Sequence, residues 1–219
     1  MNEPDVLNHF KKILHDQLPG AGVSIQSLPR ANPLKLALID PAFDDSCLSQ
    51  DVQNKLMDDP PYWIFCWASG YALAELILKE QIDVSNKVVV DFGAGGGAGA
   101  IAAALAGASK VYACDIDPVG NEVLALNALI NKVSIEIVDD LAKADGVDLL
   151  IAADVLYERA NYHFLDLFLT AAPDIVVADS RLKSMPNENY TLVETVNTTS
   201  FPDFNEALEF NEVKFYRNT

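Results

Sequence analysis

A regular alternation of strand-like and helical segments between residues 87 and 179 constrains the fold of this chain more than any other feature. The strand-like segments are short and apolar, and most of the segments between them repeat apolar residues at helical spacing. Strands that alternate with helices form a parallel sheet with both faces covered. We therefore expect strands at 87–92, 110–115, 134–138, 147–154 and 174–179.

The C-terminal part of the chain shows a different pattern. The segments 190–199 and 212–217 alternate apolar and polar residues, and no helix is clearly needed between them. Two such strands can pair directly as an antiparallel unit. The sequence therefore predicts an α/β fold with a doubly wound, mostly parallel sheet that these two strands close.

The N-terminal part carries shorter elements. We interpret residues 1–219 as one domain, in which 1–80 form a helical extension on the substrate side and 85–219 form the core. The expected elements of the extension are helices at 5–17, near 50–57 and from Ser69, as the N-cap, to about Glu80, with short strands at 23–28 and 34–39.

The charge and composition narrow the classes of partner. The formal net charge is −17, and such an acidic surface repels nucleic-acid phosphates and attracts a basic protein, although solubility alone explains it equally well. No apolar run reaches the roughly 18 residues of a membrane span, and the N-terminus lacks the apolar core of a signal peptide. The three cysteines form no C-x-x-C pair. We expect a cytoplasmic monomer without a metal site, a membrane or a nucleic-acid partner.

Acidic residues recur where the expected strands end. At the carboxyl edge of an open α/β sheet they would lie together, and this is the edge where ligands bind. Asp is also common in turns and at helix N-caps, but five positions at one edge favour a binding site. The positions are Asp91, Asp115, Asp139 or Asp140, Asp154 and Asp179.

The glycine-rich segment 93–98 narrows the choice of ligand. It fits the dinucleotide pattern G-x-G-x-x-G/A, and Asp115 follows Gly95 at the spacing of a ribose-binding acid, so a nicotinamide-dependent oxidoreductase or a non-catalytic nucleotide-binding module stays an alternative. Asp91, two residues before Gly93, would add negative charge beside a pyrophosphate. The same carboxylate suits a ligand with an ammonium and a sulfonium, which favours S-adenosylmethionine.

On this interpretation the other residues of the edge bind the adenosyl group. Asp115 would accept hydrogen bonds from both ribose hydroxyls, and Ile116 would lie against the adenine face. Asp139 or Asp140 would accept from the adenine amino group, although each is equally well explained as a solvated acid.

Three segments carry a family resemblance. In order, PPYWIFCWASGYALA, VVVDFGAGGGAGAIAAALAGASKVYACDIDP and ADVLYER resemble the lysine methyltransferases of the electron-transfer flavoprotein β-subunit, from a wider set with a D-x-x-Y motif, here Asp154-Val-Leu-Tyr157. The resemblance implies a Rossmann-like, seven-stranded methyltransferase sheet with an antiparallel C-terminal strand, and a lysine acceptor. The family's D-P-G-R segment is replaced by Asp179-Ser180-Arg181. Ribosomal-protein and small-molecule N-methyltransferases remain alternatives.

A lysine acceptor gives the D-x-x-Y residues a role. Asp154 would bind and orient the amine, and Tyr157 would pack on the lysine stem, unless it is simply a packed aromatic residue. If the chain turns helically here, the two side chains point the same way.

Three further residues are candidates around the site. Trp67 would stand beside the cofactor and Trp63 would contact the substrate, with core packing as the alternative for this pair at i and i+4. Arg181 would hold a substrate carboxylate or carbonyl, or form an exposed salt bridge.

Overall fold

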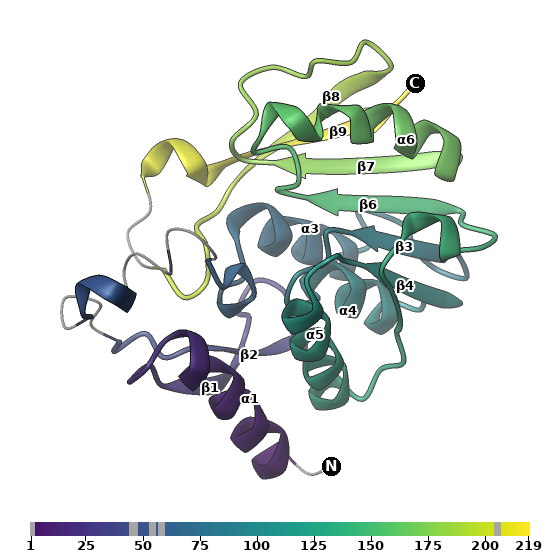
Figure 1. Ribbon diagram of the computed structural model, residues 1–219. Coiled ribbons are helices and arrows are strands. Elements are labelled where there is room, and N and C mark those ends of the chain that lie inside the picture. The colour runs from purple at the N-terminus through teal and green to yellow at the C-terminus, as the bar shows by residue number, and fades with distance from the viewer. Residues whose placement is uncertain (1–2, 44–47, 53–55, 57–59, 204–206) are drawn as a thin grey trace.

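A seven-stranded sheet forms the centre of the molecule, with the strand order β5-β4-β3-β6-β7-β9-β8 (Figure 1). The computed structural model describes residues 3–43, 48–52, 56, 60–203 and 207–219. The strands are β3 (Val88–Phe92), β4 (Lys110–Cys114), β5 (Glu136–Val138), β6 (Leu149–Ala153), β7 (Asp174–Asp179), β8 (Tyr190–Asn197) and β9 (Glu212–Asn218).

The strand directions confirm the predicted fold class. The strands β3 to β7 pair in parallel, whereas β9 pairs antiparallel with both β7 and β8. After β5 the chain crosses to the other side of β3 and continues with β6. This reversal places the topological switch point, where α/β sheets bind ligands, beside the carboxyl end of β3.

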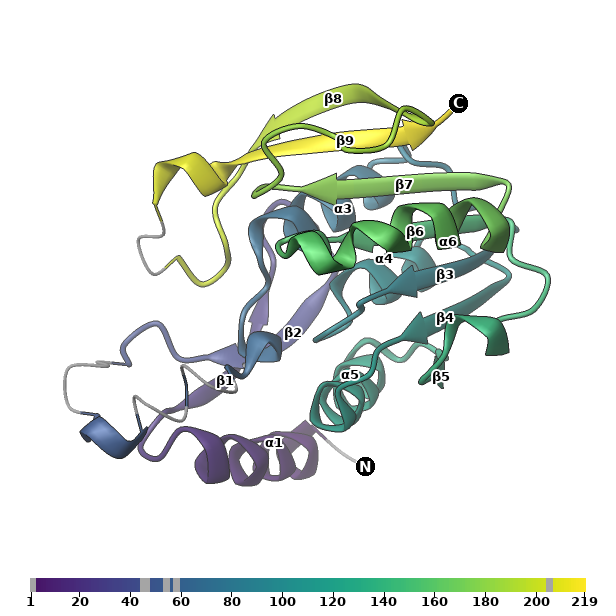
Figure 2. The same cartoon turned by 45° about the horizontal axis from the view of Figure 1, so that its top comes forward.

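Helices cover both faces of the sheet because neighbouring residues of a strand point to opposite sides. Val89 belongs to the core cluster that includes α3 (Ala68–Leu78) and α4 (Ala98–Leu105), whereas Val90 belongs to the cluster that includes α6 (Phe164–Ala171). Figure 2 shows α6 in front of the sheet and α3 and α4 behind it. The doubly wound arrangement is thus confirmed.

Two expected helices differ in detail from the structure. The helical segment expected between the strands at 147–154 and 174–179 starts as the 3-10 helix η4 (Arg159–His163) before α6. The prediction that Ser69 caps a helix is wrong, because α3 begins at Ala68 with Trp67 as its N-cap. The Ser69 hydroxyl instead donates a hydrogen bond to Asp154, 2.6 Å away.

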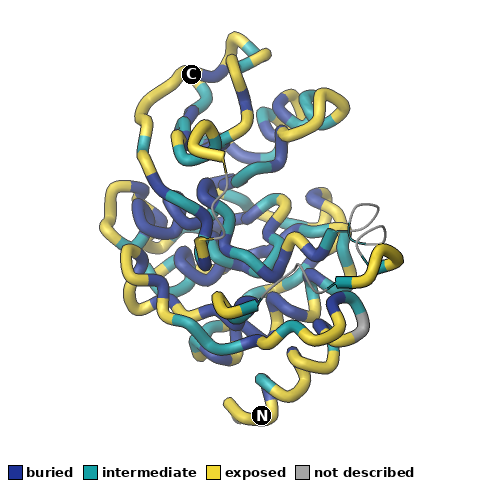
Figure 3. Tube along the Cα trace, turned by 90° about the vertical axis from the view of Figure 1, so that its left-hand side faces the viewer, coloured by how far each residue is buried: buried dark blue, intermediate teal, exposed yellow. Residues whose placement is uncertain are grey.

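The N-terminal elements form a separate layer against α5 (Pro118–Asn131). Helix α1 (Glu3–Gln17) packs there together with the antiparallel pair β1 (Val23–Ser27) and β2 (Lys35–Ile39). Helix α1 is amphipathic, as predicted, and its outer face is exposed (Figure 3). Of the short helix expected near 50–57, residues 53–55 and 57 lie outside the described residues.

Asn127 of α5 connects this layer to the glycine-rich segment. Its side chain is fully buried. Its Oδ1 accepts a hydrogen bond from the Ala37 N–H at 2.9 Å, and its Nδ2 donates to the Gly96 carbonyl at 2.8 Å. One side chain therefore links β2 to the loop after β3. Within the described chain, no helix is long and apolar enough to cross a membrane.

Candidate active site

The predicted acids lie at the carboxyl edge of the sheet, as expected. They come from β3, the loops after β4, β5 and β6, and the end of β7, so they surround the switch point. Asp91 lies within β3, Asp115 directly follows β4, Asp139 and Asp140 follow β5, Asp154 directly follows β6, and Asp179 ends β7.

The glycine-rich loop bends back over this edge. Gly93, Gly95 and Gly97 have φ values of 70°, 50° and 88°, which favour glycine. A Cβ atom at Gly93 would come within 2.5 Å of Val155 Cγ1, so glycine is needed there for packing. At Gly95 a Cβ would meet no described heavy atom within 4 Å. The backbone of Gly95 therefore borders open space, where a ligand can approach closely.

The Asp115 carboxylate is held in place beside this space. Its Oδ2 accepts from the Gly95 N–H at 2.8 Å, and its Oδ1 accepts from the Asp117 N–H at 2.9 Å. A carboxylate oxygen has about two lone-pair sites, so each oxygen can accept one more hydrogen bond. Ile116 alongside is 89% exposed, an uncovered apolar surface. Two oriented acceptors next to an apolar surface fit a ribose diol and an adenine ring.

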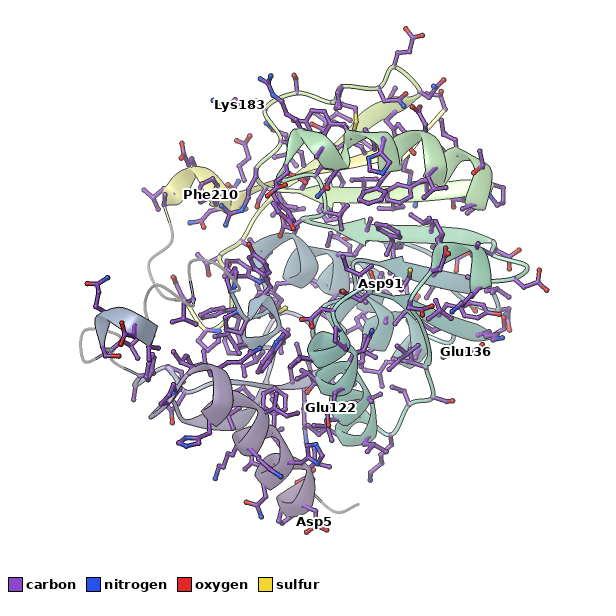
Figure 4. All side chains as sticks on the ribbon, viewed as in Figure 1. Asp5, Asp91, Glu122, Glu136, Lys183 and Phe210 are labelled. Carbon is purple, nitrogen blue, oxygen red and sulfur yellow. The ribbon has the colours of Figure 1, made fainter. Side chains whose placement is uncertain are left out.

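Asp91 is placed below the loop. Its side chain is 3% exposed, and its Oδ2 accepts a hydrogen bond from the Ala100 N–H at 2.7 Å, in the first turn of α4 (Figure 4). Burial, and secondarily the charge of Asp115, raise the pKa of Asp91 to about 7. A cationic ligand nearby would favour its ionised form. Direct contact between Asp91 and such a ligand stays a prediction.

Asp154 lies on the other side of β3 in an unusual backbone conformation. Its φ is 52°, in the left-handed region that non-glycine residues rarely occupy. Its carboxylate accepts hydrogen bonds from the hydroxyls of Ser69 and Ser180 at 2.6 and 3.0 Å. Backbone conformations of this kind persist where surrounding contacts enforce them, and they are frequent at functional sites. Neither serine was predicted as a site residue.

Tyr157 joins a group of aromatic side chains near the carboxyl end of β6. The chain does not turn helically between Asp154 and Tyr157, because Asp154 has a positive φ and η4 begins only at Arg159, so the condition for the two side chains to point the same way is not met. Tyr157 is 52% exposed, and its ring centroid lies 6.1 Å from that of Tyr62, which lies 6.1 Å from that of Trp67. Partial burial raises the pKa of Tyr157. We call Tyr62, Trp67 and Tyr157 the aromatic rim.

The connection between β8 and β9 continues this rim. The backbones of Cys66 and Phe201 pair through hydrogen bonds of 2.8 and 2.7 Å. Farther along, Phe210 lies on a short helix beyond the ends of β6 and β7 (Figure 4), and the Arg181 guanidinium lies 4.1 Å from its ring centroid. Arg181 also lies 5.8 Å from the ring of Trp67. The predicted Arg181 therefore adjoins the rim, whereas Phe210 was not predicted.

Trp63 does not belong to the rim. It is 2% exposed, and its ring packs edge-on against Phe10 of α1, with 5.5 Å between the ring centroids. This is the core packing that the sequence left as an alternative, and a substrate contact would require the surrounding chain to move.

Asp139 and Asp140 are exposed and have local partners. Asp139 forms an ion pair with Lys143, which lowers the pKa of Asp139. Asp140 caps the 3-10 helix η3 (Leu141–Lys143), because its Oδ1 accepts from the Ala142 N–H at 2.9 Å. A contact of either acid with an adenine amino group stays a prediction.

Comparisons with known proteins agree with the sequence resemblance. The family model described as Ribosomal protein L11 methyltransferase (PrmA) matches residues 73–161. The electron transfer flavoprotein beta subunit lysine methyltransferase of Mus musculus is 36% identical over 113 residues, covering 50% of this chain and 44% of the relative. Its Homo sapiens counterpart is 37% identical over 104 residues, covering 45% and 39%. The matched segment thus makes up less than half of each relative's own length.

Solved structures share the fold. A putative RNA methyltransferase from Pyrococcus horikoshii matches with a TM-score of 0.53 at 23% identity, covering 67% of this chain and 82% of that one. Magnesium protoporphyrin IX methyltransferase from Synechocystis, with bound SAM, matches with a TM-score of 0.53 at 18% identity, covering 68% and 78%. The chain has the fold of these methyltransferases, and about half of it is similar in sequence to lysine methyltransferases of the electron-transfer flavoprotein β-subunit.

Proposed function

We propose that this protein is an S-adenosylmethionine-dependent methyltransferase that methylates a lysine of a protein. The observation that carries the proposal is the meeting of two groups of residues at the switch point of the sheet. Asp115 and Ile116 offer acceptors and an apolar surface for an adenosyl group, and Asp154 with the aromatic rim offers a site for an amine. The family match and the named relatives support the same class of reaction.

On the donor side each residue has a distinct task. Gly93 and Gly95 let the backbone approach the ligand, Asp115 binds the ribose, and Ile116 covers the adenine. Asp91 lies near the positive end of the donor and balances its charge from below the loop. Bound S-adenosylmethionine would supply a methyl group on a sulfonium, ready for in-line displacement. The chain's own contribution is to hold the acceptor in line and to exclude water.

On the acceptor side the amine must first become neutral. A lysine ammonium has a reference pKa of about 10.4, and burial next to a positive charge lowers it. Asp154 opposes this shift, so we assign it to binding and orienting the amine and to receiving its proton for release to water. The nitrogen lone pair then forms the new N–C bond as the S–C bond breaks. The ring of Tyr157 packs against the lysine stem, and Trp67 favours a cation at the rim.

The protein substrate is inferred from charge and from the relatives. A net charge of −17 favours a substrate with a basic surface around the target lysine. The electron-transfer flavoprotein β-subunit is the first candidate, because the named relatives act on it by name. Ribosomal protein L11 is the second, because the matching family model carries that description over residues 73–161.

Transfer of radiolabel tests the proposal. The protein is incubated with labelled donor and with each purified candidate protein or a cell lysate, and we expect label in a protein band. Asp154→Ala should abolish it. Glu136→Ala, which removes an exposed acid at the start of β5, should leave it unchanged.

The possible failures are distinguishable. Label confined to small metabolites would overturn the protein acceptor and leave a small-molecule methyltransferase. In a calorimetric titration we expect adenosylhomocysteine to bind and NAD not to bind. The reverse result would overturn the methyltransferase and favour a nicotinamide-dependent enzyme.

A further inference from the structure

The carboxylate of Asp154 is surrounded by donors from two separate segments. Oδ1 accepts from the Ser69 hydroxyl at 2.6 Å, from the Ser180 hydroxyl at 3.0 Å and from the Ser180 N–H at 3.2 Å. Among the described residues, Oδ2 accepts only one hydrogen bond, a long one of 3.3 Å from the Ser69 N–H. Ser69 belongs to the first turn of α3, and Ser180 directly follows β7. The three residues are distant in sequence and meet only in the folded chain.

The two carboxylate oxygens therefore differ in their remaining capacity. A carboxylate oxygen has about two lone-pair sites, and three donors already converge on Oδ1. Oδ2 keeps a site for a short hydrogen bond. We propose that Ser69 and Ser180 are positioning residues, which hold Oδ1 so that Oδ2 faces and binds the substrate amine. This inference rests on the proposed function.

Such a hold has a physical purpose. The terminal torsion of an Asp side chain is broad, so an unrestrained carboxylate samples many orientations. Hydrogen bonds to a charged oxygen are about twice as strong as neutral ones, so two hydroxyls restrict it effectively. A displacement without a covalent enzyme intermediate is accelerated mainly by correct orientation of the acceptor. The two serine hydroxyls therefore fix the Asp154 carboxylate, which keeps the amine aligned with the methyl donor at little energetic cost.

The neighbouring Asp179 makes these hydrogen bonds to Asp154 more important. Asp179 is fully buried, and burial together with the charge of Asp154 raises the pKa of Asp179 to about 6. The two carboxyl groups therefore repel each other when both are ionised. The Asp179 Oδ1 already accepts hydrogen bonds from the N–H groups of Arg181 and Leu182, at 2.8 and 2.6 Å. This repulsion would turn the Asp154 carboxylate away from Asp179. The hydroxyls of Ser69 and Ser180, which donate to Asp154, oppose that rotation.

The experiment compares hydroxyl deletions with a hydroxyl that is restored. The variants are Ser69→Ala, Ser180→Ala and Ser180→Thr, with Thr170→Ala as a matched control. Thr170 also donates a 2.7 Å hydrogen bond, to the Leu167 carbonyl on exposed α6, away from the site. The measurements are kcat and KM for the labelled protein substrate at saturating donor, Kd for adenosylhomocysteine, and Tm.

We expect each serine deletion to lower kcat by about 10- to 100-fold, the size of effect that small misplacements cause. Kd for adenosylhomocysteine should stay within about twofold, because the serines lie on the acceptor side. Ser180→Thr should recover most of the activity, and Thr170→Ala should match wild type.

Three results would overturn the positioning role. These are unchanged kcat in both deletion variants, equal losses in Ser180→Ala and Ser180→Thr, or a loss of kcat matched by losses in Tm and donor affinity, as expected for a merely structural role. Failure of the proposed function is different, because the wild-type protein itself would then transfer no label to a protein.

Discussion

Asp91 couples the stability of the fold to pH. Burial raises its pKa from 3.8 to about 7, so the folded state holds this proton more tightly than the unfolded chain. The stabilisation from this group is fully present below about pH 4 and is lost as the pH rises through about 7. Asp91→Asn keeps an acceptor for the Ala100 N–H and carries no charge.

We therefore expect Asp91→Asn to gain stability relative to wild type as the pH rises from 4 to 7. The difference should grow by up to about 1.4 kcal/mol per pH unit. Urea denaturation at several pH values measures it. A difference that stays constant over this range would contradict the burial of an ionisable Asp91.

Substitutions at two glycines separate packing from ligand approach. Gly95→Ala adds a methyl group at a φ of 50° into open space, so it should cost about 1–2 kcal/mol and weaken adenosylhomocysteine binding at least about tenfold. Gly93→Ala should lose more stability, because its Cβ would overlap Val155. Gly146→Ala is the control, because Gly146 also has a positive φ, of 66°, and open surroundings. It lies before β6, at the opposite edge of the sheet from the site.

Thermal denaturation and calorimetry measure the two effects. Gly146→Ala should match the stability loss of Gly95→Ala and retain full donor affinity. Equal donor affinities in these two variants would show that no ligand approaches Gly95.

At the residue level the sequence predicted the acids better than their partners. Asp115 and Asp154 could be placed at the carboxyl edge of the sheet because the hydrophobic pattern shows where each strand ends. Ser69 was misassigned, because a hydroxyl ahead of a helix is a typical N-cap and its contact with Asp154 depends on tertiary packing. Trp63 and Trp67 looked equivalent by helical spacing. The extended backbone of Phe65 separates them, so one enters the core and the other reaches the rim.

Among the elements, α5 is the one that joins the N-terminal layer to the glycine loop. Asn127→Leu removes both hydrogen bonds of the buried amide and leaves the Ala37 N–H and the Gly96 carbonyl unpaired. We expect a loss of about 2–4 kcal/mol in the free energy of unfolding, together with weaker donor binding. Urea denaturation and calorimetry measure these losses.

Asn131, one turn farther along α5, offers a matched control. Its side chain forms hydrogen bonds with the backbone of Lys35 in β2, and none with the described residues of the glycine-rich loop. Asn131→Ala should reduce stability by a smaller amount and leave donor affinity unchanged. Weakened donor binding in both variants would show that the effect passes through the whole layer rather than through Asn127.

The sequence was sufficient to predict which helices and strands form, but not which of them lie next to each other in the fold. Short apolar runs and helical periodicity placed the strands of the main sheet and the amphipathic α1. The strand order depends on crossovers that no local pattern records. Strand β5 is shorter than expected, since pairing with β4 extends only from Glu136 to Val138.

For the whole molecule, the net charge of −17 should govern the encounter with the proposed basic protein substrate. Attraction between opposite charges raises association rates and is screened by salt, with a Debye length of about 8 Å at 0.15 M. We expect kcat/KM for the protein substrate to fall about tenfold or more between 0.02 and roughly 0.3 M salt, with little change in kcat. Initial rates across a salt series measure this.

A flat salt response would contradict a charge-guided encounter and leave the acidity as a matter of solubility. Adenosylhomocysteine affinity serves as the internal control, because a small ligand with little net charge should respond weakly to salt over the same series.

The pairing of Cys66 with Phe201 has a consequence for the order in which the site comes into existence. The proposed donor residues all lie between positions 91 and 140, and most of them follow one another within β3, β4 and their loops. The proposed acceptor side draws on Tyr62 and Ser180 and adjoins the connection between β8 and β9, which pairs with Cys66 through Phe201 and contacts Arg181 through Phe210. A growing chain would thus complete the donor half well before the acceptor half.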